Sequence, residues 1–297
     1  LAYIDIAQDG VTLIKGETQA SDTRNGYGLI SIAFVPDADG DGGDELVIGS
    51  TSTDTPVHVH DNFFGALTVE DSHTTFKGGE SLFLAGGEGF ATADKFRLVI
   101  GRGNGGAYVL NPLLTAASRT LPLDGSNEIL LESYVVGAAS GRPTVIGSVS
   151  NDGDPDLVVS NPLAESYKGM FSLDFELDGE DENNAPDATF VNDLPLLDPG
   201  TVCGWAVTSG DFDGDGIEDL AASRSDVNLA GSVRVWWGPV KAEAFHCSGQ
   251  VRFDGHAGDR FGSYLAAGDV TGDGFDDLVI AASGSVEEVY IISGRGL

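Results

Sequence analysis

Residues 261–283 decide the fold that the sequence predicts, and they read FGSYLAAGDVTGDGFDDLVIAAS. An apolar run leads into a turn of Asp and Gly, and a second apolar run follows and ends in small residues. Short apolar runs bounded by Asp and Gly are typical of β-strands. The stretch therefore predicts two neighbouring strands joined by an acidic turn. We find no amphipathic helical stretch of useful length elsewhere in the chain.

The same layout occurs five times. Residues 203–223 read CGWAVTSGDFDGDGIEDLAAS, and residues 37–50 read DADGDGGDELVIGS. Two copies are eroded: residues 148–159 read SVSNDGDPDLVV, and the copy that starts at Gly89 has lost its first three acids but keeps an apolar strand. The turns start at 37, 89, 148, 211 and 269, so the steps are 52, 59, 63 and 58 residues. A period above 50 suits one four-stranded propeller blade per repeat.

We therefore predict an all-β fold, a β-propeller of four-stranded antiparallel blades, as a single domain over residues 1–297. Candidate third strands lie at residues 57–60, 106–110, 232–236 and 289–292, and candidate fourth strands at 11–14 and 251–253. Residues 1–6 read like the third strand of a preceding blade. A small closed ring with an extra strand and a part of a longer array both fit this pattern. Because the chain begins with Leu, we expect it to be trimmed or excised from a longer protein.

The composition limits the kinds of partner that the chain is expected to bind. The 42 Gly and 11 Pro among 297 residues fit many tight turns. The formal net charge is -32, from 47 Asp+Glu against 15 Lys+Arg. Since phosphate binding needs a basic surface, nucleic acid is a poor partner, whereas cations, basic partners or a salty habitat fit better. No apolar run approaches the roughly 18 residues that a membrane span needs.

The acidic turns have the chemistry of a calcium site. In the best copies, acids stand at positions 1, 3, 5 and 9 of the turn, with Gly at position 6. A solvated acidic turn is the alternative for any single copy, but three similar copies at matching places favour bound ions. Ca²⁺ takes about six to eight oxygen ligands in flexible geometry. An EF-hand is excluded because its position 12 must be Glu, whereas position 12 is Ile48, Ala222 or Ile280 here.

The segment from Phe261 to Ala282, with its Gly268-Asp269 turn, resembles the FG-GAP repeat of integrin α-subunit propellers and their bacterial relatives. In that family the calcium loop joins the innermost strand of a blade to the next strand, on the lower face of the disc. Ligands often bind on the upper face. The resemblance implies an extracellular or cell-surface protein, an adhesion or recognition role, and Ca²⁺ as a structural ion.

The resemblance also implies which residues hold three calcium ions. The first set is Asp37, Asp39, Asp41, Glu45 and the carbonyl of Gly43; the second is Asp211, Asp213, Asp215, Asp219 and the carbonyl of Ile217; the third is Asp269, Thr271, Asp273, Asp277 and the carbonyl of Phe275. The copy at 148 replaces two acids by serine, so Asp152, Asp154 and Asp156 imply at most a weak fourth site. The copy at Gly89 is expected to bind no ion.

No convergent catalytic set is visible, so we expect a binding protein and not an enzyme. Two further possibilities stay open: a lectin-like carbohydrate binder, and a propeller hydrolase or lyase that acts on acidic polysaccharide. The pair His58 and His60 fits a metal ligand or one side of a half-exposed strand. For Trp236 and Trp237, packing of one ring in the core is favoured over a sugar-stacking platform made of both rings. Neighbouring residues on a strand face opposite sides of the sheet.

The connections between second and third strands are expected on the face opposite the calcium loops. They carry Arg102 and Arg224, rare cations on so acidic a chain. We expect these two residues to help capture an anionic protein or glycan ligand. Cys203 and Cys247 are the chain's two cysteines; a disulfide in a secreted protein and two buried free thiols are both possible.

Overall fold

The computed structural model describes seventeen segments of the chain, namely 13–15, 31–35, 42–49, 57–60, 66–68, 74–77, 81–87, 97–102, 107–110, 119–122, 128–131, 142–161, 170–174, 187–191, 202–225, 230–285 and 287–296. Within these segments the structure is all-β, apart from one 3₁₀ turn, η2 (Gly294–Gly296). No helix in the described part is long and apolar enough to cross a membrane.

Five antiparallel sheets follow one another along the chain, each running from an inner to an outer strand. The first contains β2 (Ser31–Val35), β3 (Glu45–Gly49), β4 (Val57–His60) and β6 (Thr74–Lys77). The second contains β7 (Ser81–Gly87), β8 (Arg97–Arg102), β9 (Ala107–Leu110) and β11 (Glu128–Leu131). The third contains β12 (Arg142–Ile146), β13 (Asp156–Asn161), β14 (Met170–Asp174) and β15 (Ala188–Val191). The fourth contains β16 (Val202–Gly210), β17 (Asp219–Ser225), β18 (Ser232–Trp236) and β20 (Val251–Asp254). The fifth contains β21 (Phe261–Gly268), β22 (Asp277–Ala282) and β23 (Glu288–Ile292).

Some blades also pair with a strand that crosses over from the next one. Strand β10 (Arg119–Pro122) lies between β9 and β11 in sequence but pairs in parallel with β6 of the first sheet. Strand β19 (Ala244–His246) pairs in the same way with β15 of the third sheet. Strand β5 (Ala66–Thr68) has the corresponding place in sequence and pairs in parallel with β1 (Leu13–Lys15). Each crossing strand adds main-chain hydrogen bonds between consecutive repeats.

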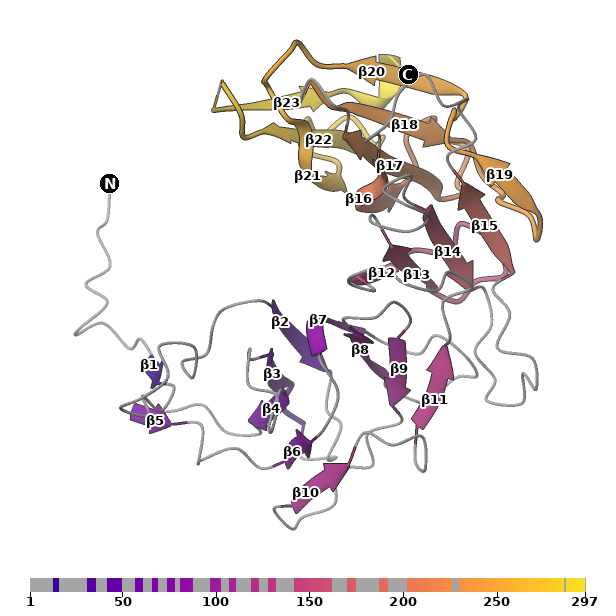
Figure 1. Ribbon diagram of the computed structural model, residues 1–297. Coiled ribbons are helices and arrows are strands. Elements are labelled where there is room, and N and C mark those ends of the chain that lie inside the picture. Colours follow the sequence, from indigo (N-terminus) through magenta and orange to yellow (C-terminus); the bar gives the residue numbers. More distant parts are fainter. Residues whose placement is uncertain are drawn as a thin grey trace.

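The five sheets stand side by side in an arc, as Figure 1 shows. The inner strands β2, β7, β12, β16 and β21 line its concave side, and each contacts the next one along the chain. In this view the arc is open between the fifth sheet and the first. The predicted all-β propeller of repeated blades is confirmed, with one inner strand for each of the five repeats.

Most of the predicted strands are present. Residues 57–60, 232–236, 251–254 and 288–292 form β4, β18, β20 and β23. Residues 1–6 lie outside the described residues. The predicted fourth strand at 11–14 is described from Leu13 onward as β1, and its partner is β5.

Burial between neighbouring sheets explains why the strand sequences are apolar on both sides. Every residue of β4 and of β18 is buried. One cluster joins Val47, Val57 and Val59 of the first sheet to Leu98 and Ile100 of the second. The fourth and fifth sheets meet through a similar cluster. A strand covered on both faces has no polar side. Apolar and polar residues therefore do not alternate along it as they do along a half-exposed strand.

This packing decides two open questions about the sequence. His58 and His60 are both buried, so the half-exposed strand that we considered for them is wrong. Trp236 is buried in the cluster between the third and fourth sheets, where its ring meets that of Phe190 edge-on. Trp237 packs against the cluster between the fourth and fifth sheets. The two tryptophans therefore pack on opposite faces of one blade, as strand geometry requires.

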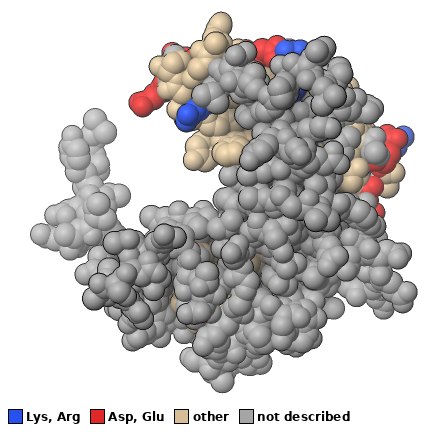
Figure 2. Space-filling model, in the orientation of Figure 1, with Lys and Arg blue, Asp and Glu red and all other residues tan. Residues whose placement is uncertain are grey.

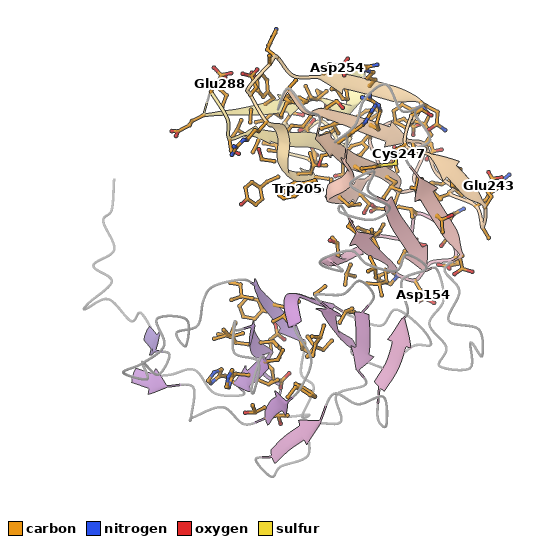
Figure 3. The ribbon with its side chains drawn as sticks, in the orientation of Figure 1. Asp154, Trp205, Glu243, Cys247, Asp254 and Glu288 are labelled. Atoms are coloured by element: carbon orange, nitrogen blue, oxygen red, sulfur yellow. A yellow bond between two sulfur atoms is a disulfide. The ribbon has the colours of Figure 1, made fainter. Side chains whose placement is uncertain are left out.

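In the view of Figure 2, charged side chains of described residues are visible along the outer edge of the last blades. On this edge acidic groups stand beside basic ones, and Glu243, Asp254 and Glu288 mark its extent in Figure 3. Three clusters of apolar side chains lie between the sheets, and polar groups such as His60 and Arg234 are buried as well.

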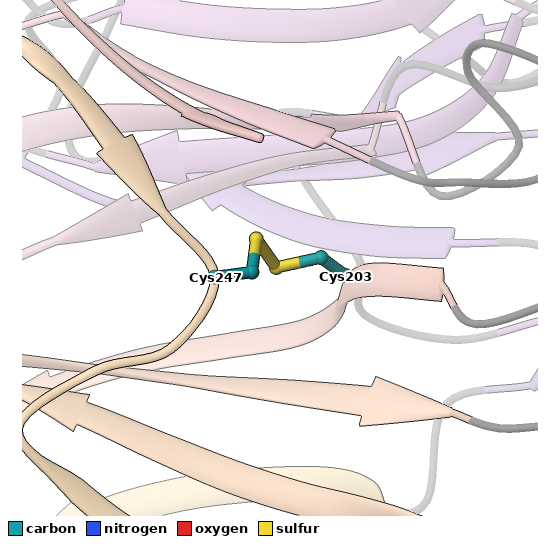
Figure 4. Close-up of a disulfide and its surroundings, with 2 residues drawn as sticks. All are labelled: Cys203 and Cys247. Atoms are coloured by element: carbon teal, nitrogen blue, oxygen red, sulfur yellow. A yellow bond between two sulfur atoms is a disulfide. The ribbon is translucent and has the colours of Figure 1, made fainter. Parts of the chain in front are cut away.

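Cys203 and Cys247 form a disulfide across 44 residues of sequence (Figure 4). Cys203 lies in the inner strand β16, and Cys247 follows β19, the strand that pairs with the third sheet. Both cysteines are buried in the cluster between the third and fourth sheets. Of the two possibilities for these residues, the disulfide is the one present, and it ties the crossing segment to the core of its own blade.

The disulfide is expected to stabilise the fold by restricting the unfolded chain. For a loop of this length the entropic model gives about 4 kcal/mol. The double variant Cys203→Ala/Cys247→Ala should lose roughly that free energy of unfolding in urea titrations under oxidising conditions. Wild type that has been unfolded, reduced and refolded in reductant is the control, and it should match the double variant closely. Two free thiols in the denatured, unreduced wild type would contradict the assignment.

Candidate metal centre

The loop between β16 and β17 gathers three carboxylates. Carboxylate oxygens of Asp211, Asp213 and Asp215 all lie within 4.8 Å of one another. Asp211 is half-buried, and the other two are exposed. A metal ion could be held by a group of at least three acidic, histidine or cysteine side chains. Among the residues that the structure describes, these three carboxylates form such a group. Three of the four predicted acidic ligands of the second site are therefore brought together.

Backbone N–H groups hold these carboxylates in place. Gly214 N donates to Oδ1 of Asp211 at 2.8 Å, and Gly216 N donates to Oδ2 at 3.0 Å. Asp213 and Asp215 each accept from the backbone N–H two residues further on, as Asp does in tight turns. Both glycines have positive φ, 76° and 86°. The alternation of Asp and Gly thus bends the chain so that every second side chain turns toward one centre.

The loop between β21 and β22 repeats this arrangement. Oδ1 of Asp269 accepts from Gly272 N at 2.7 Å, and Oδ2 accepts from Gly274 N at 3.0 Å. Asp273 accepts from the N–H of Phe275 at 3.2 Å. The hydroxyl of Thr271 donates to Oδ1 of Asp277 at 3.4 Å. Thr271 therefore places a neutral hydroxyl where the second loop has a carboxylate, and the third loop carries less negative charge than the second.

The acid at position 9 has a role that sequence reasoning missed. Glu45, Asp156, Asp219 and Asp277 hold this position, and all four are buried. The carboxylate of Asp219 accepts from Phe212 N in its own loop at 3.0 Å, and from Gly238 N just after the third strand at 2.8 Å. Asp219 is not a member of the three-carboxylate group. Asp219 thus links the acidic loop to the end of the third strand, and we call such a buried acid at position 9 the brace of its blade. Its recurrence in four of the five repeats was the sequence signal that could have revealed this role.

The fifth blade has the same brace. Asp277 accepts from Thr271 N at 2.7 Å and from Gly294 N at 3.3 Å. Gly294 stands two residues after β23, just as Gly238 stands two residues after β18. A Cβ at Gly294 would lie 2.2 Å from the carbonyl oxygen of Asp276, so only glycine fits there. Loop, second strand and the end of the third strand are thereby joined at one buried carboxylate.

Burial, hydrogen bonds and neighbouring charges shift the pKa of these position-9 carboxylates. Burial raises the pKa of Asp219 to about 6; N–H bonds from Gly238 and Phe212 oppose the rise, and the charges of Asp213 and Asp215 add to it. For Asp277, burial also works to raise the pKa, but hydrogen bonds from Thr271, Gly294 and Val270 outweigh it, and the pKa is lowered. A cation in the fourth-blade loop would offset the mutual repulsion of its carboxylates.

The loop of the third blade closes without a full set of acids. Ser148 stands where the other loops have Asp, and its Oγ accepts from Gly153 N at 3.0 Å, as Asp211 does from Gly216 N. The same hydroxyl donates to Asp152 at 3.0 Å. Asp152 also accepts from Asp154 N at 2.9 Å. Serine therefore preserves the turn but removes negative charge from this loop.

The first predicted site lies mostly outside the described residues. Asp37, Asp39 and Asp41 are not described, nor are the first three positions of the copy at Gly89. Gly43 is exposed and Glu45 is buried at the start of β3. The carbonyl-bearing residues of the other two sites, Ile217 and Phe275, are both half-buried in their loops.

Neighbouring loops are joined to one another. Asp211 N donates to Oδ2 of Asp276 at 3.0 Å, and Asp276 N donates to the carbonyl of Asp211 at 3.1 Å. The ring of Phe275 lies against Gly214, where a Cβ would be 2.3 Å from it. On the other side, Gly147 N donates to Oγ of Ser209 at 2.8 Å. The loops of the third, fourth and fifth blades therefore lie side by side on one face.

The two predicted partner-binding arginines lie at the other end of the strands. Arg102 is the last residue of β8, and Arg224 is half-buried near the end of β17. Both belong to strands and not to the connecting loops in which the sequence placed them. They hold the same place in their repeats, five residues after position 9.

Arg224 has cationic neighbours that the sequence did not single out. Arg234 of β18 stands directly opposite Arg252 of β20. Arg252 contacts Asp254 at 2.6 Å, while Arg234 lies 3.7 Å from the same carboxylate. The pKa of Arg234 is lowered to about 10, mainly by burial and also by the charges of Arg252 and Arg224, while Asp254 opposes the fall. The fourth blade thus concentrates positive charge away from its acidic loop.

Comparisons with known proteins agree with this architecture. The family model described as "FG-GAP repeat" matches residues 204–236 and 261–292. The WD40 domain of a Toxoplasma gondii coronin has a similar fold, with a TM-score of 0.55 and 14% identity over 97% of this chain and 60% of that one. The chain is therefore a β-propeller that carries FG-GAP repeats.

In sequence the chain is similar to integrin α subunits. It is 41% identical to integrin alpha-PS2 of Drosophila melanogaster over 81 residues, which are 27% of this chain and 5% of that protein. It is 38% identical to integrin alpha-4 of Xenopus laevis over 107 residues, 32% of this chain and 10% of that protein. The chain thus matches only a small part of the length of either relative.

The brace of the third blade gives a pH dependence that can be measured. Burial raises the pKa of Asp156 to about 7, whereas an Asp in an unfolded chain titrates near about 3.9. Between about pH 3.9 and pH 7, Asp156 therefore stays protonated in the folded state but loses its proton in the unfolded chain. The stability that this proton adds is lost as the pH rises through about 7. We expect the free energy of unfolding, measured by urea titration with a chelator present, to fall over this window in wild type.

Asp156→Asn is the matched variant because it keeps the shape but does not titrate. Between about pH 4 and pH 7 its free energy of unfolding should change less than that of wild type. The difference between the two changes should be at most about 4 kcal/mol, which corresponds to a shift of roughly three pKa units. Parallel pH profiles of wild type and Asp156→Asn would show that the buried carboxyl does not behave in this way.

Proposed function

We propose that this chain is an extracellular, calcium-binding recognition or adhesion module, a single β-propeller domain over residues 1–297 that catalyses no reaction. The observation that carries the proposal is the gathering of Asp211, Asp213 and Asp215 on a loop whose backbone donors orient all three carboxylates. The recurrence of that loop at Asp269 supports it. The likeness to integrin α chains supports an adhesion role.

The donor set suits calcium. Hard carboxylate and carbonyl oxygens on an adaptable loop fit Ca²⁺, whereas Mg²⁺ demands tighter octahedral geometry and retains water. In this proposal Asp211, Asp213, Asp215 and Asp219, with the carbonyl of Ile217, hold one ion. Asp269, Thr271, Asp273 and Asp277, with the carbonyl of Phe275, hold another, and Asp37, Asp39, Asp41, Gly43 and Glu45 form the remaining strong site.

The ion has a structural role in this proposal. The loops of the fourth and fifth blades are joined by reciprocal hydrogen bonds between Asp211 and Asp276. Neutralising the carboxylates there would therefore strengthen the contact between blades as well as the loop. An oxidising compartment outside the cell is supported by the buried disulfide, because such bonds persist there and are rare in the cytosol.

Calcium titration tests the proposal. Chelation at moderate ionic strength should lower the melting temperature of wild type, since each site filled at about 100 times its Kd adds roughly 2.7 kcal/mol. Asp215→Asn keeps the acceptor for Ile217 N but removes a charged ligand, so it should reduce the calcium-dependent shift and the number of tightly bound ions. Calorimetry and melting curves measure both quantities.

Asp152→Asn is the matched control because Asp152 holds the same loop position in the third blade, where serine replaces two acids. Its calcium response should equal that of wild type. A melting temperature that chelation leaves unmoved would refute the structural ion. Equal losses in both variants would instead show that general surface charge is responsible.

The partner is expected on the face opposite the calcium loops. We propose that Arg224 and Arg102 contact an anionic protein or glycan there, with Arg234 and Arg252 close to Arg224. Guanidinium groups suit carboxylate and sulfate because they donate two parallel hydrogen bonds.

Binding to a panel of carboxylated and sulfated glycans and acidic peptides tests this placement. Arg224→Ala and Arg102→Ala should weaken binding by about tenfold or more at unchanged melting temperature. Arg295→Ala is the control, since Arg295 is exposed in η2, beside the calcium loops. If Arg295→Ala weakens binding and Arg224→Ala does not, the partner lies on the calcium face.

A further inference from the structure

Asp276, the acid at position 8 of the fifth-blade loop, belongs to neither set of proposed ligands on the fourth and fifth blades. It is bonded to Asp211, the first residue of the fourth-blade loop. Asp211 N donates to Oδ2 of Asp276 at 3.0 Å, and Asp276 N donates to the carbonyl oxygen of Asp211 at 3.1 Å. Position 1 of one loop is therefore joined through both its N–H and its C=O to position 8 of the next loop.

Asp276 also stands between two residues that the proposed site of the fifth loop uses. Phe275 before it offers a carbonyl, and Asp277 after it is the buried brace. The ring of Phe275 packs on the fourth loop, because it lies against Gly214. A Cβ at Gly210, just before the fourth loop, would lie 3.1 Å from the Cβ of Asp276. A shift of the fourth-loop backbone is therefore passed directly to two ligand positions of the fifth loop.

An ion in the fourth loop would fix the partner to which Asp276 is bonded. The carboxylate of Asp211 accepts from Gly214 N and Gly216 N, and one of its oxygens lies within 4.8 Å of oxygens of two further carboxylates. Without a cation these like charges repel one another, which favours a looser loop. With a cation, the N–H and C=O of Asp211 are held where they bond to Asp276. The fifth loop then starts closer to the shape that binds an ion, so less ordering remains to be done.

The position-8 acid of the fourth loop makes a similar contact with the third loop. Glu218 lies against Gly147, which precedes position 1 of the third loop as Gly210 precedes position 1 of the fourth. The third loop has serine in place of two acids, so it has less negative charge for a cation to organise. The fourth and fifth loops, in contrast, are neighbours that both carry the acids of a strong site.

We propose that Asp276 is a positioning residue that couples these two ion sites. Calcium in the fourth loop raises the calcium affinity of the fifth loop through the bonds between Asp211 and Asp276, and linkage requires the reverse effect to have the same size. The coupling rests on the proposed function, because it takes both loops to bind calcium. It goes beyond that function because the two blades would lose their ions together, over a narrower range of calcium concentration than two independent sites.

Calcium binding to chains with one and with two of these sites measures the coupling. The parent chain carries Asp39→Asn and Asp41→Asn, which remove two charged ligands of the first proposed site. Adding Asp215→Asn leaves the fifth loop, and adding Asp273→Asn leaves the fourth loop, so isothermal titration calorimetry gives the association constant of each alone. For independent sites, the overall constant for filling both loops of the parent chain equals the product of these two constants. We expect it to exceed the product by about fivefold or more.

Variants of the parent chain at Asp276 show whether this residue carries the coupling. In Asp276→Ala the excess over the product should disappear, although every proposed ligand is kept. Asp276→Asn should retain most of the excess, because the amide oxygen still accepts from Asp211 N while the charge is gone. Glu218→Ala is the matched control, since it removes an acid at the same position of the fourth loop, and the excess should remain as in the parent chain.

The possible outcomes distinguish the coupling from calcium binding itself. An overall constant equal to the product in the parent chain would overturn the coupling and leave the calcium sites standing. The same excess in Asp276→Ala would show that Asp276 is not the positioning residue. If neither loop binds calcium, both proposals fail. Melting curves report whether each variant is folded, and Asp276→Leu, which has a similar shape and no acceptor, replaces Asp276→Ala if that variant does not fold.

Discussion

In the fourth blade, two N–H groups from different parts of the chain converge on one buried carboxylate, that of Asp219. Phe212 brings the acidic loop to it, and Gly238 brings the end of the third strand. Since an unpaired buried carboxylate costs several kcal/mol, these partners are not interchangeable with water. The brace holds the loop in the shape that gathers Asp211, Asp213 and Asp215, so the proposed ion site depends on the buried Asp219 for its geometry.

The brace also explains why the loops stand in line. Its equivalents, Asp156 and Asp277, fix the same corner of the third and fifth blades. With the corners fixed, the sheets can pack face to face, and the loops come close enough for Asp211 and Asp276 to exchange hydrogen bonds. Blade packing, crossing strands and the disulfide then act on the same interfaces. Stability in this fold is distributed between consecutive repeats and does not reside in one central core.

In the fourth blade, acidic and basic side chains lie toward opposite ends of the strands. Carboxylates gather in the loops between first and second strands, whereas Arg224, Arg234 and Arg252 lie toward the other end of the fourth blade. The two groups are held apart by the length of the strands. A cation at the acidic loop and an anion at the arginines would therefore not compete for the same part of the blade, as the proposed function requires.

The sequence by itself determined the strands, the five repeats and the positions of the acidic loops, because these depend on local patterns of apolar, acidic and glycine residues. It also located Asp211, Asp213 and Asp215, since a turn of alternating Asp and Gly has few conformations. It misjudged His58 and His60, whose polar side chains are buried between sheets, and it assigned Arg224 to a loop.

Contacts distant in sequence were decided only by the tertiary structure. The bond from Gly238 to Asp219, the crossing of β19 to the third sheet and the choice of a disulfide over free thiols all join segments that local pattern does not relate. The physical reason is that a blade's apolar pattern specifies that a face is covered, while the neighbour that covers it is set by how the repeats stack.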